Sequence, residues 1–232
     1  NYHQDMSYTG KRSPMWLKIK VAADKDGRLL AMEGDWSVDH GPYSEFGDLL
    51  TLRVNQFMGA GYNIPNIRSI GRTVATNHVW GSAFRAYGSP QSFLASESVI
   101  DELAEKMGMD PFELRYKNVY RPGATTPTGQ TPEVTPFVAM FDALRPKYVA
   151  AKEKAKKEST PQFKKGVGIS LGVYGCGLDG TDSSEAAVEL TPTGVIVYAS
   201  WEDHGQGADA GMLGTAHNAL LPLEITPSAI KL

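Results

Sequence analysis

The N-terminal region of the chain alternates apolar and polar residues in two successive stretches. Residues 15–21 alternate apolar side chains with lysines, and residues 29–38 continue the alternation. Asp26-Gly27 between them is a turn signal. Alternation places the apolar side chains on one face of a strand, so this region predicts a β-hairpin. Similar patterns predict further strands at residues 72–76, 166–172, 184–190 and 195–200, the last two joined by a Pro-Thr-Gly turn.

Other stretches repeat apolar residues at helical spacing. The pattern predicts a helix with Ser89 as N-cap, Pro90 at the first helical position and Gly108 just past its end. Asp110-Pro111-Phe112-Glu113 has the form of a capping box and starts a second helix that ends near Asn118. Further helices are predicted at residues 137–144, from Pro146 to Glu158, and at 208–220. Residues 46–57 indicate either a short helix or an irregular crossing segment, because the spacing of their leucines fits neither a helical nor a strand periodicity clearly.

These elements predict an α+β fold with mixed or antiparallel sheets and packed helices. Residues 120–136 are rich in Pro, Thr and Gly and read as a connecting loop, and residues 159–165 mark a boundary. We therefore expect two subdomains, residues 1–160 and 161–232. Because the sequence begins with Asn1 in a polar stretch and not with a methionine, we expect it to be a segment of a longer chain.

Composition excludes several classes of protein. The 232 residues are 41% hydrophobic and 21% charged, which suits a globular chain with a sizeable core. No apolar run approaches the roughly 20 residues of a membrane-spanning helix. A net charge of -3 with dispersed basic residues argues against a nucleic-acid partner. The single cysteine, Cys176, excludes an internal disulfide or a protein-held iron–sulfur centre in this segment, and it is compatible with a cytoplasmic location.

Two glycine-rich stretches carry the candidate chemistry. Residues 81–91 place Arg85 between two aromatic residues at the start of a helix. In residues 201–207, Gln206 lies between two glycines, and the stretch follows a strand and opens the helix at 208–220. Free N–H groups at such a helix start can hold an anion, a phosphate or the polar atoms of a cofactor. The spacing matches neither a dinucleotide-binding fingerprint nor a P-loop.

The amino-acid sequences of both stretches resemble those of a known family. Ala83-Phe84-Arg85-Ala86-Tyr87-Gly88-Ser89-Pro90-Gln91, upstream of His204-Gly205-Gln206-Gly207, resembles the molybdopterin-binding region of the xanthine oxidase family of molybdenum hydroxylases. The resemblance covers most of the chain and includes Lys11-Arg12 with Pro14, Ile64-Pro65-Asn66 and Asp110-Pro111. Within the family, the chain looks most similar to bacterial aldehyde oxidoreductases that carry molybdopterin cytosine dinucleotide. Both subdomains would then belong to the molybdenum-cofactor-binding region.

The resemblance implies roles for matching residues. Arg85 would lie at the molybdenum site, orient the carbonyl of the substrate and stabilise charge developing on its oxygen. Contacts to the cofactor would come from Phe84, Arg85, His204, Gly205, Gln206 and Gly207, with the helix that follows aimed at its polar part. The walls of a substrate channel would be Phe46, Leu49, Leu178 and Tyr87, the last also offering a hydroxyl where purine-oxidising members carry phenylalanine.

The implied reaction is hydroxylation of a small-molecule aldehyde to a carboxylic acid. Electrons would leave through [2Fe-2S] clusters, held outside this segment, to an electron acceptor protein, and the full-length protein would be a homodimer. The sequence lacks iron–sulfur cysteine motifs, the upstream glycine-phenylalanine motif and a glutamate base motif, the last expected well past Leu232. Glu202 and Glu224 lie in no matching motif. The isolated segment is therefore expected to be inactive.

Other interpretations stay open beside this one. A non-catalytic module could use the Gly-Gln-Gly helix start to hold an anion or a partner. Cys176 with Asp203 and His204 could form a thiol nucleophile set, although a lone cysteine among glycines is more often a small buried residue. The remaining histidines show no ligand spacing, so no metal held by protein side chains is expected; they are His3, His40, His78 and His217.

Overall fold

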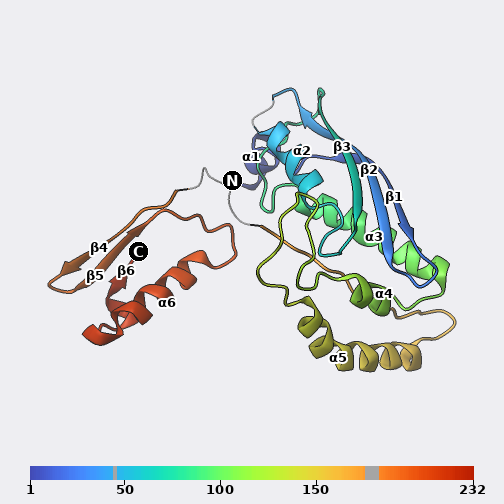
Figure 1. Cartoon of the computed structure of the whole chain (residues 1–232). Helices are drawn as coiled ribbons and strands as arrows, with labels where there is room; N and C mark the ends of the chain where they lie inside the picture. Colours follow the sequence, from blue (N-terminus) through green and yellow to red (C-terminus); the bar gives the residue numbers. More distant parts are fainter. Residues whose placement is uncertain (44–45, 176–182) are drawn as a thin grey trace. The chain divides into compact units, whose positions relative to one another are not determined.

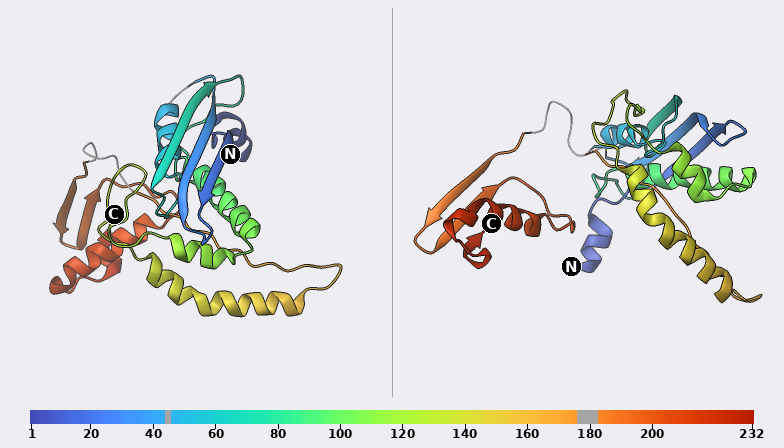
Figure 2. Two further views of the ribbon diagram at one scale, coloured as in Figure 1. Left: turned by 45° about the vertical axis from the view of Figure 1, so that its right-hand side comes forward. Right: turned by 60° about the horizontal axis from the view of Figure 1, so that its bottom comes forward.

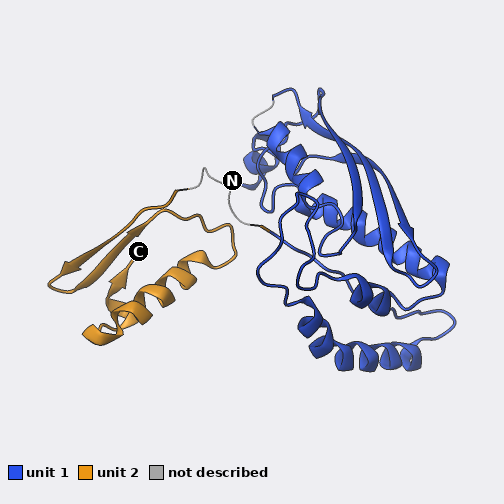
Figure 3. Ribbon diagram, viewed as in Figure 1, with its two compact units in different colours: residues 1–174 blue, residues 175–232 orange. Residues whose placement is uncertain are grey.

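The computed structural model of the chain describes residues 1–43, 46–175 and 183–232. It divides into two compact units, Asn1–Tyr174 and Gly175–Leu232 (Figure 3). Each unit has a three-stranded sheet with helices packed on it, which confirms the expected α+β class. The division into cofactor-binding subdomains at residues 160 and 161 stays a prediction.

The sheet of the first unit is mixed, with β2 (Leu29–Gly41) in its centre. β1 (Met15–Ala23) pairs antiparallel with β2, and β3 (Asn66–Ala75) pairs parallel with it. The expected β1–β2 hairpin is confirmed, and Gly27 supplies the left-handed residue of its turn at a φ of 80°. The parallel pair requires a crossover, and this carries α2 (Gly47–Gln56). The short-helix alternative for residues 46–57 is therefore correct.

Helices α2 and α3 (Ser89–Met107) lie along one face of this sheet (Figure 1, Figure 2). The inward residues Trp36 and Val38 are fully buried, together with Val54 of α2 and Ile100 of α3. The other face of the sheet is charged and solvated, with cross-strand ion pairs such as Arg68 to Glu33 at 3.3 Å. One apolar layer between sheet and helices therefore holds α2 and α3 in place.

A helical layer follows α3 in the first unit. The Asp110 carboxylate accepts the Phe112 N–H at 2.8 Å and caps α4 (Pro111–Asn118), as the sequence predicts. The Phe112 ring then packs at 5.0 Å from the rings of Phe141 and Tyr148 on α5 (Phe137–Glu158). Aromatic packing therefore docks α5 on α4.

Two elements predicted for this unit are wrong. Pro146 does not start a new helix but lies inside α5, exposed to solvent. The helix continues through it because Phe141, Tyr148 and Ala155 form one buried stripe, and their burial offsets the hydrogen bond that proline cannot donate. Residues 166–172 form no strand. Their alternation instead packs Leu171 and its neighbours against the core of the first unit.

The second unit is built on a hairpin and one helix. β4 (Ala186–Thr191) and β5 (Gly194–Ala199) pair antiparallel through the Pro-Thr-Gly turn, as the sequence predicts. After α6 (Ala208–Leu220), β6 (Ile230–Lys231) pairs parallel with β5. Val195, Val197 and Ile230 form the buried core beneath α6.

The sequence analysis missed one helix of the first unit, the polar helix α1 (Tyr2–Tyr8). Its signal was the capping box of Asn1 and Gln4.

Candidate functional site

The Arg85 loop, residues 82–88, adopts a strained backbone before α3. Ala86, Tyr87 and Gly88 have φ values of 71°, 39° and 88°, so three successive residues are left-handed, two of them not glycine. The Tyr87 N–H donates to the Phe84 carbonyl at 2.8 Å, and the Ser89 N–H donates to the Ala86 carbonyl at 3.0 Å. Non-glycine residues persist in such a conformation only where the surroundings over-determine it, and they are frequent at binding sites.

This turn changes how α3 begins. Gly88, not Ser89, is the N-cap, and Pro90 follows in the first turn. The Ser89 hydroxyl donates to the Ala86 carbonyl at 2.6 Å instead of capping the helix. The sequence prediction of Ser89 as N-cap is therefore wrong, because the left-handed turn draws the hydroxyl back to the loop. Gly108 at the other end is the left-handed C-cap that the sequence predicts, with a φ of 64°.

Two segments anchor the start of the loop. The Gly81 N–H donates to the His40 carbonyl of β2 at 3.1 Å, and the Ser82 N–H donates to the Lys11 carbonyl at 3.1 Å. A Cβ on Gly81 would lie 2.1 Å from the Ser13 Oγ and 2.9 Å from the His40 Nδ1, and both of those side chains are buried. Only glycine fits this position, so the loop leaves the sheet at a sterically fixed point.

We expect Gly81→Ala in the full-length protein to lower the free energy of unfolding by about 1–3 kcal/mol, because the added methyl overpacks the site against Ser13 and His40. Thermal unfolding of the two proteins measures the loss. Gly166→Ala is the matched control, since a Cβ there meets nothing within 4 Å. Equal melting temperatures for Gly81→Ala and the wild type would show that the contact is not restrictive.

The structure brings three of the predicted channel residues together. The Tyr87 hydroxyl donates to the Phe46 carbonyl at 2.7 Å, and Leu49 lies one turn further along α2. Phe46 and Leu49 remain 49% and 36% exposed. A Cβ on Gly88 would lie only 3.0 Å from the Leu50 carbonyl, so the Arg85 loop runs directly against α2. The Tyr87 hydroxyl thus ties the loop to α2. Leu178 lies outside the described residues.

The Arg85 and Phe84 side chains are both exposed, Phe84 at 48%. Arg12 lies against them: its Nη2 donates to the Arg85 carbonyl at 2.7 Å, and its guanidinium lies 4.7 Å from the Phe84 ring centre. The Gln91 amide donates to the Ser13 carbonyl at 3.1 Å. The sequence analysis gave Arg12 and Gln91 no role of their own, although both stand in the motifs that carry the resemblance.

In the second unit, the start of α6 differs from the expected open anion site. The Asp203 carboxylate accepts the N–H groups of Gly205 at 2.7 Å and Asp209 at 3.2 Å, with a longer bond from Gly207 at 3.4 Å. These backbone donors hold the pKa of Asp203 below its usual range. The prediction of free N–H groups is therefore wrong for Gly205, Gly207 and Asp209, because the Asp203 carboxylate accepts from them. The signal was an acidic residue shortly before a helix start.

The polar side chains of this loop, residues 201–207, also hold its shape. The Gln206 amide donates to the Glu202 carbonyl at 2.7 Å, and its oxygen accepts the His204 N–H at 2.6 Å. The His204 Nε2 lies 3.0 Å from the Glu202 carboxylate. All of these groups are exposed. Arg85 and Gln206 belong to different compact units, and their meeting at one cofactor stays a prediction.

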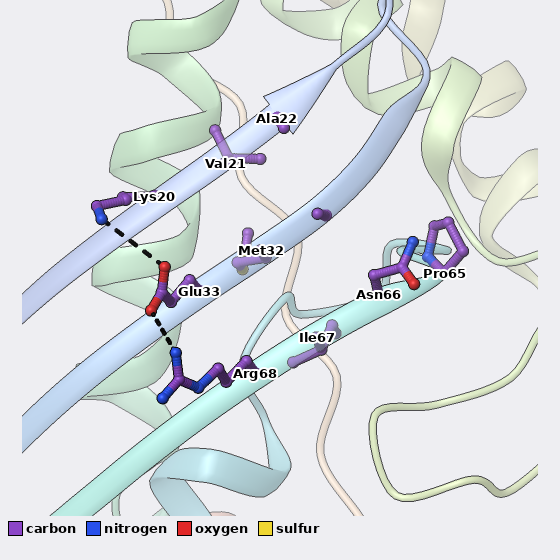
Figure 4. Close-up of a pocket in the computed structure, with 10 residues that line it drawn as sticks. Lys20, Val21, Ala22, Met32, Glu33, Pro65, Asn66, Ile67 and Arg68 are labelled. Atoms are coloured by element: carbon purple, nitrogen blue, oxygen red, sulfur yellow. Dashed lines mark hydrogen bonds and ion pairs between the residues drawn. The ribbon is translucent and has the colours of Figure 1, made fainter.

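A separate hollow of about 660 Å³ lies over the sheet of the first unit (Figure 4). Lys20 and Arg68 flank Glu33 there, at 3.7 Å and 3.3 Å from its carboxylate oxygens. The cations are therefore paired with a carboxylate from the same sheet. None of the candidate site residues lines this hollow.

Within residues 1–43, 46–175 and 183–232, no three His, Cys, Asp or Glu side chains are grouped to hold a metal ion. No helix in those ranges combines the length and apolar character that crossing a bilayer requires.

Comparison with known families defines the class of protein. Family models described as the molybdopterin cofactor-binding domain match residues 1–119 and 143–232. The chain belongs to this family of molybdopterin cofactor-binding domains, as found in the xanthine oxidase family of molybdenum hydroxylases, which confirms the resemblance.

Individual relatives narrow the class. The chain is 69% identical over its whole length to aldehyde oxidoreductase of Megalodesulfovibrio gigas, and it spans 26% of that protein. It is 32% identical to xanthine dehydrogenase/oxidase of Felis catus, covering 94% of this chain and 17% of the relative. The solved aldehyde oxidoreductase from Desulfovibrio gigas matches with a TM-score of 0.94 at 68% identity, over the whole chain and 26% of that structure. The chain thus spans about a quarter of the length of the aldehyde oxidoreductases that it matches.

Proposed function

We propose that the chain is part of a molybdenum-dependent aldehyde oxidoreductase that oxidises aldehydes to carboxylic acids. The observation that supports this best is the 69% identity to an aldehyde oxidoreductase across all 232 residues. The overall reaction takes an aldehyde and water to a carboxylic acid with release of two electrons and two protons. A bound molybdenum cofactor would supply the oxygen-transfer and electron-accepting chemistry.

An unpartnered polar atom just after the Arg85 loop suits a polar cofactor. The Oε1 of Gln91 is buried and has no hydrogen-bond partner among the described residues. It is an acceptor, and a pterin edge offers N–H donors. A buried acceptor without a hydrogen bond is costly, so this atom calls for a partner.

The residues divide the work in this proposal. Arg85 orients the carbonyl of the substrate and stabilises negative charge developing on its oxygen. Phe46, Leu49, Tyr87 and Leu178 line the approach of the aldehyde. Phe84 contacts the cofactor from the first unit, and His204, Gly205, Gln206 and Gly207 contact it from the second. Because Asp203 accepts the N–H groups of Gly205, Gly207 and Asp209, these last contacts would use side chains and carbonyl groups. The same carboxylate weighs against the alternative of a non-catalytic anion-binding module.

Further parts of the proposal concern the whole protein. The cofactor would be the cytosine dinucleotide form of molybdopterin, and [2Fe-2S] clusters elsewhere in the longer chain would pass electrons to an acceptor protein. The enzyme would be a cytoplasmic homodimer. The 232 residues alone would be inactive, since they span about a quarter of the aldehyde oxidoreductase that they match.

The test uses the purified full-length protein. We expect stoichiometric molybdenum, release of cytidine monophosphate on acid hydrolysis, and conversion of benzaldehyde to benzoate with an artificial electron acceptor. Nicotinate and xanthine serve as control substrates and should turn over much more slowly. Folded, molybdenum-loaded protein that oxidises nicotinate or xanthine but not benzaldehyde would contradict the aldehyde assignment. Folded protein without molybdenum would contradict the class of reaction.

A further inference from the structure

Arg12 connects two distant parts of the first unit. It precedes β1 and lies 73 positions before Arg85, yet its Nη2 donates to the Arg85 carbonyl at 2.7 Å. The same guanidinium lies 4.7 Å from the centre of the Phe84 ring. A planar guanidinium can stack on a ring and donate in its own plane at the same time. One side chain therefore holds two successive residues of the Arg85 loop.

The contact falls where the loop needs support. The Arg85 carbonyl belongs to the peptide unit that enters the left-handed turn at Ala86, Tyr87 and Gly88. A hydrogen bond to that carbonyl resists rotation of this peptide plane, and rotation of the plane would redirect the Arg85 side chain. The stacked Phe84 ring fixes the preceding residue. Arg12 thus acts on the backbone that sets the direction of the Arg85 guanidinium.

The charge of Arg12 is not explained by stability. Among the described residues, no carboxylate pairs with the Arg12 guanidinium, and its buried Nη1 has no hydrogen-bond acceptor. Burial also lowers the pKa of Arg12, which indicates a cost for the charged form. By contrast, the buried Arg115 contacts two carboxylates. A cation held at this cost, with a neutral carbonyl as its acceptor, points to a role in the site.

We propose that Arg12 is a positioning residue for Arg85: it holds Phe84 and the Arg85 carbonyl so that the Arg85 guanidinium faces the carbonyl of the substrate. This inference rests on the proposed function. It assigns Arg12 a role in turnover, acting through Arg85.

The first test is kinetic and uses the full-length enzyme. Arg12→Met can cover the Phe84 ring but cannot donate, and it should lower kcat by about 10–100-fold with KM and molybdenum content close to wild type. Arg12→Lys can still donate and should recover part of kcat. In the Arg85→Ala background, Arg12→Met should cause no further loss, because residues that act as a unit are not additive.

The second readout does not depend on activity. Hydrogen exchange of peptides covering residues 82–92 reports the Tyr87 and Ser89 amides, which bond within the loop. Arg12→Met should speed their exchange about tenfold. Arg121→Met is the matched control: Arg121 also donates to backbone carbonyls and lies over the Tyr116 ring, but at the end of α4. It should leave both kcat and loop exchange unchanged.

Several outcomes would overturn the inference. Unchanged kcat and exchange in Arg12→Met would remove the role, and a fall in kcat matched by lost molybdenum would make Arg12 a residue for cofactor retention. A further, independent loss in the double variant would show that Arg12 does not act through Arg85. If Arg85→Ala itself kept full activity, the role of Arg85 in turnover would fail and that of Arg12 with it, whereas the aldehyde activity would stand and loop exchange would still decide whether Arg12 holds the loop.

Discussion

Arg85→Ala in the full-length enzyme is expected to lower kcat for an aldehyde by about 10²–10³-fold, the usual loss when a preorganised group that stabilises oxyanion charge is removed. The exposed guanidinium stands on a strained loop that is anchored to β2, to α2 and to Arg12. Because the side chain is exposed in the described structure, its removal should cost the fold little. Steady-state kinetics measure the effect, with molybdenum content and melting temperature determined on the same samples.

Two companion variants sharpen this result. Arg85→Lys keeps the charge without the planar fork, so we expect activity between alanine and wild type. Arg72→Ala is the control: Arg72 is a half-exposed arginine that pairs with Asp35 on the outer face of the sheet. It should change kcat by less than about twofold, since exposed ion pairs contribute little. Full activity in Arg85→Ala, with loaded and folded protein, would remove Arg85 from the mechanism.

Glu97→Ala should cause the largest loss of stability, about 3–5 kcal/mol, because it leaves the buried Arg115 without its main partner. The Arg115 side chain is fully buried, and its Nε donates to the Glu97 carboxylate at 2.9 Å. The Tyr62 hydroxyl donates to the same carboxylate at 2.6 Å, and the Leu171 N–H does so at 3.0 Å. One carboxylate therefore joins α3, α4 and two connecting segments.

The charges in this cluster support each other. Burial lowers the pKa of Arg115, but Tyr62 and the carboxylates of Glu97 and Asp101 more than offset this and raise it above its ordinary value. Burial, with the Glu97 carboxylate, also raises the pKa of Tyr62, so the hydroxyl remains a donor. Glu97→Ala removes the group on which both donors depend.

Denaturant unfolding of the full-length protein, followed through the transition that contains this unit, measures the effect. Glu97→Met combined with Arg115→Met should lose less than the sum of the two single variants, since no buried charge is then left alone. Lys106→Ala is the control, because Lys106 and Glu102 form an exposed pair at 4.0 Å and should contribute less than about 0.5 kcal/mol. A loss below 1 kcal/mol for Glu97→Ala would show that water or local movement satisfies Arg115.

Most of the fold follows from signals a few residues long. The β1–β2 turn at Gly27, the Asp110 cap of α4 and the left-handed Gly108 were all predictable, because each depends on neighbours in the sequence. Pro146 was misread because its local effect on the backbone competes with a buried stripe that continues on both sides of it. Residues 166–172 were misread because alternation indicates one buried face, and helices can bury that face as well as a neighbouring strand can.

By itself, the sequence determined the class of this protein: the motif around Arg85 and the one around Gln206 indicate a molybdopterin-binding segment, and the family comparison confirms it. Tertiary structure alone decided how the Arg85 loop is held. The left-handed turn and the contact of Arg12 with a residue 73 positions away cannot be read from spacing. Their geometry depends on which distant or neighbouring donors find an acceptor once the backbone has folded, and only the folded chain brings those atoms together.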